Sequence, residues 1–450
     1  MRRALTILDA ALLLACVAGL ARVIAMTGLH MPLDPNEGWN AYHTLAAMSG
    51  GPLYPPAGSF LANNYPPLSY YVVGAVGWIT GDEIVAGRIV SLLSLLAVAA
   101  GMFVSARRMG ARPEASLFGV LWFVLGLLVF SDYVGMDDPQ LLGHAVAMAG
   151  FVLLLRGNVA GAALAMTLAL FVKHNLVAMP LAALAWLALT DRNAALRFAA
   201  WGMGFSALGL ILFQLVYGVS LVHVLASPRL YSLATLRDNV AAWTVWGGAG
   251  LAVMASLLLV RRRDRDVALC AIYAFAAVLI GLFFAGGAGV DMNIWFDAVI
   301  ALSLGSALAI GRFERDPHKL LAVSAYVLAL VCGLALNWED VWDRPQGADT
   351  EIAFLKAHPG PALCETLSLC YWAGKRAEVD VFNTGQAFAT GARSDAALIG
   401  LIAARRYRAM EFDSMDDFAL GPRVKEAVLA NYRVDHESDA GIFLVPRQAQ

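Results

Sequence analysis

Charged residues are scarce in this chain of 450 residues: only 15% are Asp, Glu, Lys or Arg, against about 25% in soluble domains. Lys and Arg total 32 and Asp and Glu total 34, so the formal net charge is −2. This balance gives no basic footprint and excludes nucleic acid as an expected partner. Five cysteines exclude a disulfide-rich secreted scaffold. The sequence also lacks low-complexity tracts and any repeat with the period of a solenoid.

Hydrophobic residues, in contrast, make up 60% of the chain, and the mean hydropathy is +0.66. This excess is too large for a water-soluble core, so the sequence predicts an all-α polytopic membrane domain. The first apolar run is longer than the apolar core of a signal peptide, and further runs follow it, which favours a membrane helix over a signal peptide. Eleven membrane helices are expected, several of them short for a bilayer, at 7–28, 86–106, 115–130, 140–155, 159–172, 175–190, 198–218, 241–260, 267–285, 294–311 and 320–337.

Basic residues are unequally divided between the two ends of these helices. Three lie on one side, namely Lys173, Arg229 and Arg237, and Arg88 lies at a helix boundary. Fifteen lie on the other side: Arg2, Arg3, Arg107, Arg108, Arg112, Arg156, Arg192, Arg197, Arg261, Arg262, Arg263, Arg265, Arg312, Arg315 and Lys319. Cytoplasmic loops carry the excess of Lys and Arg, so this asymmetry predicts a cytoplasmic N-terminus. An odd number of helices then places the C-terminal tail outside, which is the periplasm for a bacterial inner membrane.

The segments outside the membrane are expected to have structure of their own. Residues 1–340 form the predicted membrane domain, and its first outer loop, 29–85, contains an apolar piece at 67–80 that is too short to span and reads as an interfacial helix. Charge density rises over 341–450, which predicts a small α/β domain. Its expected strands are 362–364, 379–382 and 441–445, and its expected helices are 394–404 and 423–431. Cys364 and Cys370 lie in this domain, either as a disulfide or as two free thiols.

Acidic residues gather in two outer loops. Asp34 and Glu37 follow the first helix, and Asp137 and Asp138 lie between the third and fourth. Such residues are found as helix caps, but two acidic clusters on one membrane face also suit a general base or a site for Mg²⁺ or Mn²⁺.

Basic and aromatic residues are expected on the same face. Lys173 and His174 interrupt two apolar segments, where a lysine is either buried with a partner or extended toward the interface. Arg229 lies in another outer loop and can meet an anionic ligand. Tyr65 belongs to the aromatic residues of the first loop, which either stack on a ligand or form an interfacial belt.

Two functional classes fit this pattern. A transporter or flippase would carry its acids near the bilayer midplane, together with broken helices and paired repeats. The acids here lie at helix ends and no repeat is visible, which favours an enzyme acting on a membrane-embedded substrate.

An ordered set of motifs adds a resemblance. The set begins with the Asn-Glu-Gly-Trp-Asn-Ala-Tyr motif at 36–42 and continues with 63–70, Gly81-Asp82, Gly87-Arg88, Asp138-Pro139 and Lys173. It resembles the polytopic GT-C glycosyltransferases, in the bacterial branch that includes protein O-mannosyltransferases, aminoarabinose transferases and lipopolysaccharide-core galacturonosyl transferases. The resemblance covers about residues 1–200 in motifs and the later helices in architecture.

The resemblance implies a hexosyl or pentosyl transferase, which moves the sugar of a polyprenyl-phosphate donor to a lipid, glycan or protein acceptor with inversion at the outer membrane face. Family members carry an Asp-Glu pair after the first helix. Glu37 matches its second acid, but Asn36 stands at the first position. The implied base is therefore either Glu37 or Asp34.

The remaining roles follow from the same resemblance. Asp138 is expected to orient the acceptor or to bind a divalent cation, which the chemistry allows but does not require; Asp34 and Glu37 are further possible ligands. The residues expected to bind the substrates, and above all the donor phosphate, are Lys173, His43, Arg88, Asp137, Arg229, His174 and Tyr65.

Overall fold

Each of the eleven apolar segments forms a helix in the computed structural model, which describes residues 2–56, 58–313, 316–336 and 347–448. The predicted domain boundary at 340–341 and Arg315 lie outside these residues. The eleven helices are α1 (Arg2–Met26), α4 (Glu83–Arg108), α5 (Pro113–Phe130), α6 (Gln140–Leu155), α7 (Val159–Val172), α8 (Ala178–Thr190), α9 (Arg192–Tyr217), α11 (Leu233–Arg261), α12 (Arg265–Phe284), α13 (Phe296–Arg312) and α14 (Asp316–Leu336). In the described part, eight spans are long and apolar enough to cross a membrane, and α6, α7 and α8 are shorter. The chain is a multi-pass membrane protein.

The centre of this bundle is α13, whose residues from Phe296 to Ile310 are all buried. It packs against α5, α11 and α12. Its sequence combines large apolar residues with Ala, Ser and Gly, and such small residues allow neighbouring helices to approach closely. α13 is therefore the buried core around which α5, α11 and α12 pack.

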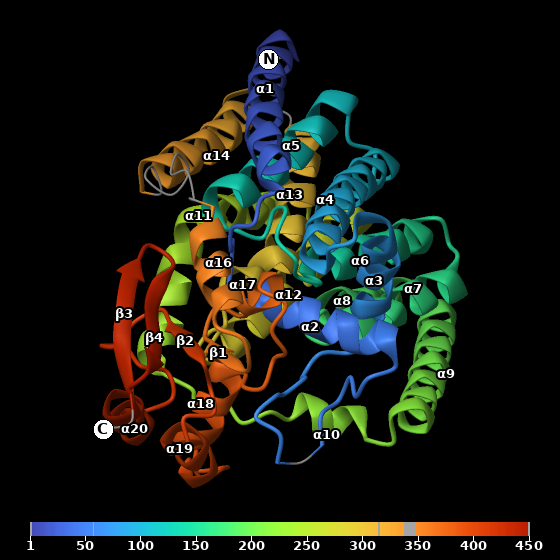
Figure 1. Cartoon of the computed structure of the whole chain (residues 1–450). Coiled ribbons are helices and arrows are strands. Elements are labelled where there is room, and N and C mark those ends of the chain that lie inside the picture. The colour runs from blue at the N-terminus through green and yellow to red at the C-terminus, as the bar shows by residue number, and fades with distance from the viewer. Residues whose placement is uncertain (1, 57, 314–315, 337–346, 449–450) are drawn as a thin grey trace.

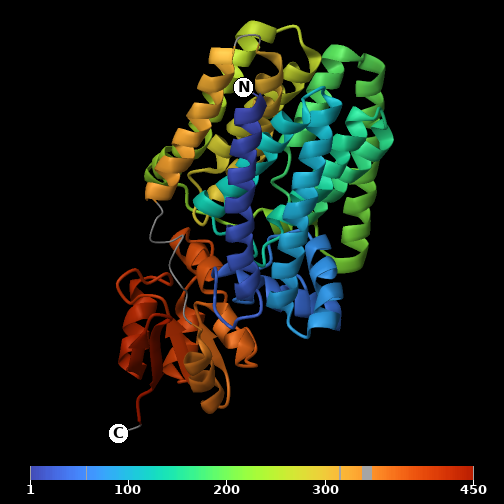
Figure 2. The ribbon, with the colours of Figure 1, turned by 90° about the horizontal axis from the view of Figure 1, so that it is seen from above.

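Short helices and loops cover one end of the bundle. The first outer loop contains α2 (Asn36–Ser49) and α3 (Leu68–Thr80), the latter matching the helix expected at 67–80. Two further pieces, α10 (Leu221–Leu225) and the 3-10 helix η1 (Met292–Trp295), belong to later loops. The N-terminal end of α1 lies at the opposite end of the bundle from the C-terminal domain (Figure 2). This arrangement agrees with one end inside and one outside, and the compartments themselves stay a prediction.

The C-terminal domain is an α/β unit at that covered end (Figure 1). Its sheet has the order β1-β2-β4-β3, with β1 (Ala362–Cys364) parallel to β2 (Ala409–Phe412) and antiparallel pairs between β2 and β4 (Gly441–Pro446) and between β4 and β3 (Tyr432–Ser438). The helices are α16 (Asp349–Ala357), α17 (Leu367–Trp372), α18 (Val381–Ala389), α19 (Ala396–Ala403) and α20 (Pro422–Asn431). One sheet face packs on residues of α16 and α17 and the other on residues of α19 and α20, as the alternation of side chains along a strand requires.

The strand expected at 379–382 is wrong. Val379 makes an isolated bridge to Phe60, and the chain then enters α18. The physical reason is Asp380, whose side chain accepts a hydrogen bond from Asn383 N and caps the helix.

Two strands were not expected: β2, which carries a buried Glu411, and β3, which is an edge strand rich in exposed polar residues. The strands expected at 362–364 and 441–445 and both expected helices are confirmed within two residues.

Several hydrogen bonds attach the C-terminal domain to the first outer loop and α4, among them three that involve side chains of Trp39, Trp372 and Tyr371. Trp39 Nε1 donates to Asp380 Oδ2 at 2.9 Å, and Trp372 Nε1 donates to Asp82 Oδ2 at 3.0 Å. In addition, Glu83 N donates to the Tyr371 hydroxyl at 2.8 Å. Gly38 of α2 lies against α17, where a Cβ atom would stand 2.0 Å from the backbone nitrogen of Ser368. The domain is therefore fixed on the membrane part rather than tethered to it.

A disulfide holds the start of α17. Cys364 and Cys370 are bonded, with their Cα atoms 6.0 Å apart, which resolves the alternative left open by the sequence. The bond closes the short segment that carries Glu365 and Leu367. Disulfides persist in oxidising compartments, so this one agrees with the predicted periplasmic location of the domain.

Replacing both cysteines, C364S/C370S, is expected to destabilise the protein by about 2 kcal/mol, the loop-closure value for so short a segment. The measurement is Tm from a thermal unfolding scan of the purified protein. C332S is the control, because Cys332 is a free cysteine in α14 and its loss should leave Tm unchanged. An unchanged Tm in the double variant would contradict a stabilising role for the disulfide.

Candidate active site

Glu37 forms a buried ion pair with Arg88. Arg88 of α4 donates from Nε to Glu37 Oε1 at 2.8 Å and from Nη2 to Oε2 at 2.7 Å, and both side chains are 0% exposed. The backbone N–H groups of Leu33 and Asp137 also donate to this carboxylate. Both oxygens of Glu37 are therefore engaged with protein donors, and the pair joins the two acidic loops to α4.

Asp138 forms a second buried ion pair, with Lys173. Lys173 Nζ lies 2.8 Å from Asp138 Oδ1 and 3.0 Å from Oδ2. Asp138 Oδ1 also accepts from the backbone of Gln140 at the start of α6. On its other side, Lys173 Nζ lies 4.8 Å from the centre of the Tyr65 ring. Lys173 is thus a buried lysine with a partner, one of the two alternatives that the sequence left open.

Asp137 points into the protein. It is 2% exposed, and a Cβ atom on Gly87 would lie 1.9 Å from its Oδ1, so the absence of a side chain at Gly87 makes room for this carboxyl group. Burial, together with the nearby carboxylates of Glu37 and Asp138, raises the pKa of Asp137 well above its usual range. The raised pKa favours the neutral form of this carboxyl group, which avoids the cost of a buried charge.

Two adjoining cavities lie beside these ion pairs. The first, of about 430 Å³, is called the acidic cavity and lies between the outer loops and the C-terminal domain. Its carboxyl groups are Asp34, Asp291, Glu365, Asp380 and Asp413. The second, of about 490 Å³, is called the cationic cavity, and its titratable lining residues include Lys173, His174 and Arg229. Residues common to both linings are Asn64, Tyr65, Arg229, Gly289, Val290 and Asn293.

Four acids were singled out in the sequence, namely Asp34, Glu37, Asp137 and Asp138. Of these, Asp34 is the one whose residue lines either of the two cavities. Its Oδ1 accepts a hydrogen bond from Asn36 N at 2.7 Å. Burial and the nearby carboxylates of Asp138, Glu37 and Asp291 raise the pKa of Asp34 to about 6, against the effect of that hydrogen bond. A carboxylate with this pKa can accept a proton near neutral pH.

The cationic cavity brings together four of the residues expected to bind substrate: Tyr65, Lys173, His174 and Arg229. The guanidinium carbon of Arg229 lies 4.7 Å from the ring centre of Phe382 in α18, so the C-terminal domain helps to position it. His174 Nδ1 is buried and has no hydrogen-bond partner among the described residues. The cavity wall also contains apolar residues, among them Leu225, Phe283 and Ile294.

His43 lies apart from both cavities. Its Nδ1 is 2.7 Å from the carbonyl oxygen of Trp39, one helical turn earlier, and its ring stacks on Tyr70. It lines a separate small pocket of about 50 Å³. His43 and Arg88, both expected near the donor phosphate, are thus placed in the packing of α2 and α4.

Sequence reasoning missed several cavity residues. Asp380, Glu365 and Asp413 come from the C-terminal domain, whose docking no local pattern reveals. Asp291 ends a Gly-rich stretch at 286–291, between two of the expected helices, and Asn64 precedes Tyr65 within the motif at 63–70. For both residues the sequence carried a signal, because each is a polar residue in a loop expected on the outer face.

In the described part of the chain, no group of three or more His, Cys, Asp or Glu side chains is arranged to hold a divalent cation. Of the three possible ligands, Glu37 and Asp138 are each neutralised by a protein cation. Asp34 faces the acidic cavity instead. The residues as arranged do not fit a Mg²⁺ or Mn²⁺ site.

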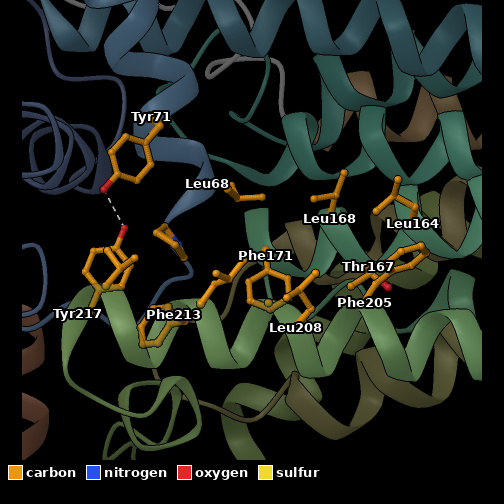
Figure 3. Close-up of a pocket in the computed structure, with 14 residues that line it drawn as sticks. Leu68, Tyr71, Leu164, Thr167, Leu168, Phe171, Phe205, Leu208, Phe213 and Tyr217 are labelled. Carbon is orange, nitrogen blue, oxygen red and sulfur yellow. Dashed lines mark hydrogen bonds between the residues drawn. The ribbon is translucent and has the colours of Figure 1, made fainter.

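A third cavity, of about 440 Å³, is an apolar groove between α3, α7 and α9 (Figure 3). Leu68, Leu168 and Phe213 are among its lining residues, and hydroxyl groups of Tyr71 and Tyr217 share a hydrogen bond of 2.8 Å at one end. No charged side chain is among its lining residues. The groove can hold hydrocarbon but offers no catalytic group.

Comparisons with known proteins bear on the fold. No protein-family model matches the sequence, and no curated protein matches it. Among solved structures, the chain is similar to ArnT from Cupriavidus metallidurans bound to undecaprenyl phosphate, at 12% identity and a TM-score of 0.62, and to the apo state of that protein, at 13% and 0.63. Each similarity covers 96% of this chain and 97% of the other. Over 96% of its length, including parts of both the membrane domain and the C-terminal domain, the chain therefore has the fold of ArnT, the GT-C fold.

Proposed function

We propose that this protein is a bacterial inner-membrane glycosyltransferase that transfers a sugar from a polyprenyl-phosphate donor to an acceptor hydroxyl at the periplasmic face. The observation that carries the proposal is the pair of adjoining cavities, one with the Asp34 carboxylate and the other with Lys173, His174 and Arg229. The fold shared with a structure that holds undecaprenyl phosphate supports it.

The cationic cavity is assigned to the donor. Lys173 has three N–H donors, and Asp138 accepts from it through both oxygens, so Asp138 fixes the ammonium group in place. Arg229 supplies a second positive charge at the junction of the cavities. Cations held in this way stabilise the negative charge on a departing phosphate. The apolar walls suit the first isoprene units of the lipid.

Asp34 is assigned as the general base. The acceptor oxygen attacks the anomeric carbon and forms the glycosidic bond, while its proton passes to the Asp34 carboxylate. The bond between the anomeric carbon and the phosphate oxygen breaks, and its electron pair leaves with the lipid phosphate. Direct displacement of this kind inverts the anomeric centre. Glu37, whose oxygens are occupied by Arg88 and two backbone groups, becomes a positioning residue.

The pH dependence follows from this assignment. The base must be ionised to accept the proton, so kcat/KM should fall about tenfold per pH unit below a pKa of about 6 and reach a plateau above it. The measurement is the initial rate of donor turnover from about pH 5 to about pH 8. The acid limb should vanish in D34N, and a flat profile for the unmodified protein would contradict Asp34 as the base.

The test of the proposed function uses protein in lipid nanodiscs with radiolabelled polyprenyl-phosphate hexose, pentose and uronic acid donors and a membrane-lipid extract. Loss of label from a donor, absent in D34N, would support the transferase and name the sugar. We expect EDTA to leave the rate unchanged, because protein cations neutralise Glu37 and Asp138. No turnover with any donor, combined with solute uptake into proteoliposomes, would replace the proposal by the transporter alternative.

A further inference from the structure

Charge is divided unequally between the two cavities. Among the described residues, the lining of the cationic cavity contains Lys173, His174 and Arg229 but no Asp or Glu. The lining of the acidic cavity contains five carboxyl groups, and Arg229 is its one Lys, Arg or His residue. Two ligands of different charge are therefore expected on the two sides of the junction.

The C-terminal domain supplies much of this acidity. Asp413 N donates to Glu365 Oε2 at 3.1 Å, and the Thr366 hydroxyl donates to Asp413 Oδ1 at 2.9 Å, so the two carboxylates are held next to each other. Burial and the proximity of Asp413 raise the pKa of Glu365 to about 7. A cation or a hydroxyl group placed between them would relieve their repulsion.

Two amide side chains point independently to a ligand. Asn64 and Asn293 line both cavities, and each residue is 8% exposed. Among the described residues, no hydrogen bond to either side-chain amide is formed, and neither amide is among the fully enclosed polar groups, so both are accessible from the cavities that they line. An amide both donates and accepts, which matches the hydroxyl groups of a sugar or another polyol.

We propose that the acidic cavity binds the acceptor and that the acceptor's head group is rich in hydroxyl groups, neutral or cationic, and free of anionic groups. This inference rests on the proposed function. Carboxylates accept hydrogen bonds from hydroxyl and ammonium groups, whereas a phosphate or carboxylate on the acceptor would meet like charges. The anionic group of the reaction, the donor phosphate, is bound on the other side of the junction.

A matched series of acceptors tests the charge. The probes are octyl glucoside, its analogue with an amine in place of the primary hydroxyl, and octyl glucuronide, in which the same carbon is a carboxylate. Nanodiscs replace detergent, since common detergents are themselves glycosides. We expect kcat/KM for the glucuronide to be at least about tenfold below that for the glucoside, about 1.4 kcal/mol, and the amine to equal or exceed the glucoside.

Probes that are not substrates are tested as inhibitors of transfer to the lipid extract, with the same expected order. Equal or better use of the glucuronide would overturn the inference, as would a series in which no probe acts as acceptor or inhibitor. Donor turnover itself, measured as the release of polyprenyl phosphate, tests the proposed function separately. A protein that consumes donor but prefers the glucuronide keeps the proposed function and loses this inference.

Two double variants test whether the acidic cavity causes the discrimination against the glucuronide. E365Q/D413N removes two carboxylates from the acidic cavity and should reduce the discrimination against the glucuronide at least about threefold, on the scale of 0.6 kcal/mol or more. The control is E437Q/D439N, because both of these residues are exposed and lie at the β3–β4 hairpin, outside the cavity lining. An unchanged acceptor ratio in E365Q/D413N, or an equal change in the control, would also contradict the inference.

Discussion

D34N is expected to lower kcat at least about 100-fold, the lower end of what a positioned general base contributes. The amide cannot accept the acceptor's proton, but its oxygen can still accept the hydrogen bond from Asn36 N, which is 2.7 Å long in the unmodified protein. The loop before α2 should therefore keep its conformation. The measurements are initial rates of donor turnover with saturating acceptor and Tm as a check of folding.

D291N is the matched control for this variant. Asp291 lines the same cavity and also accepts a hydrogen bond from a backbone N–H, that of Met292, so the change removes the same charge from the same cavity. Because Asp291 raises the pKa of Asp34, its loss should move the acid limb of the pH profile to lower pH and change kcat by less than about tenfold. A D34N protein with more than a tenth of the normal kcat, or a D291N protein that loses as much, would remove Asp34 from its role.

The helices could be predicted from the sequence because their signals are local. The apolar runs from 86–106 to 320–337 each became a helix, and the Pro-initiated piece at 67–80 became α3. The wrong prediction of a strand at 379–382 also has a local cause. Asp380 caps a helix, and this local signal for a helix start outweighed the strand preference of the apolar residues around it. Edge strand β3 has too little apolar character to be distinguished from a loop.

The site could be predicted only in part, because its assembly depends on distant contacts. Tyr65, Lys173, His174 and Arg229 were expected to bind substrate and do line a cavity. However, Glu37 meets Arg88 across 51 positions and Asp138 meets Lys173 across 35, and no spacing in the sequence reveals these pairs. The acids of the C-terminal domain depend on how that domain docks.

R88M and E37Q are expected to produce the largest losses of stability, about 3–5 kcal/mol each, because each leaves one member of a fully buried ion pair without its countercharge. Arg88 also donates to the carbonyl oxygens of Leu29 and Met31, at 2.9 and 2.6 Å, so its loss releases the segment before α2 as well. The double variant E37M/R88M removes both charges and should unfold at a higher temperature than R88M alone. The measurement is Tm for the three variants in one lipid composition.

R423M is the control, because Arg423 forms an ion pair with Asp395 at 3.0 Å but its side chain is 71% exposed; an effect within about 0.5 kcal/mol is expected. The same series distinguishes a positioning residue from a base. If Glu37 is a positioning residue and not the base, the activity lost in E37Q should be proportional to the loss of folded protein. The kcat per folded molecule should then change far less than in D34N. An E37Q protein with normal Tm and a kcat reduced about 100-fold would make Glu37 the base and reverse the assignment.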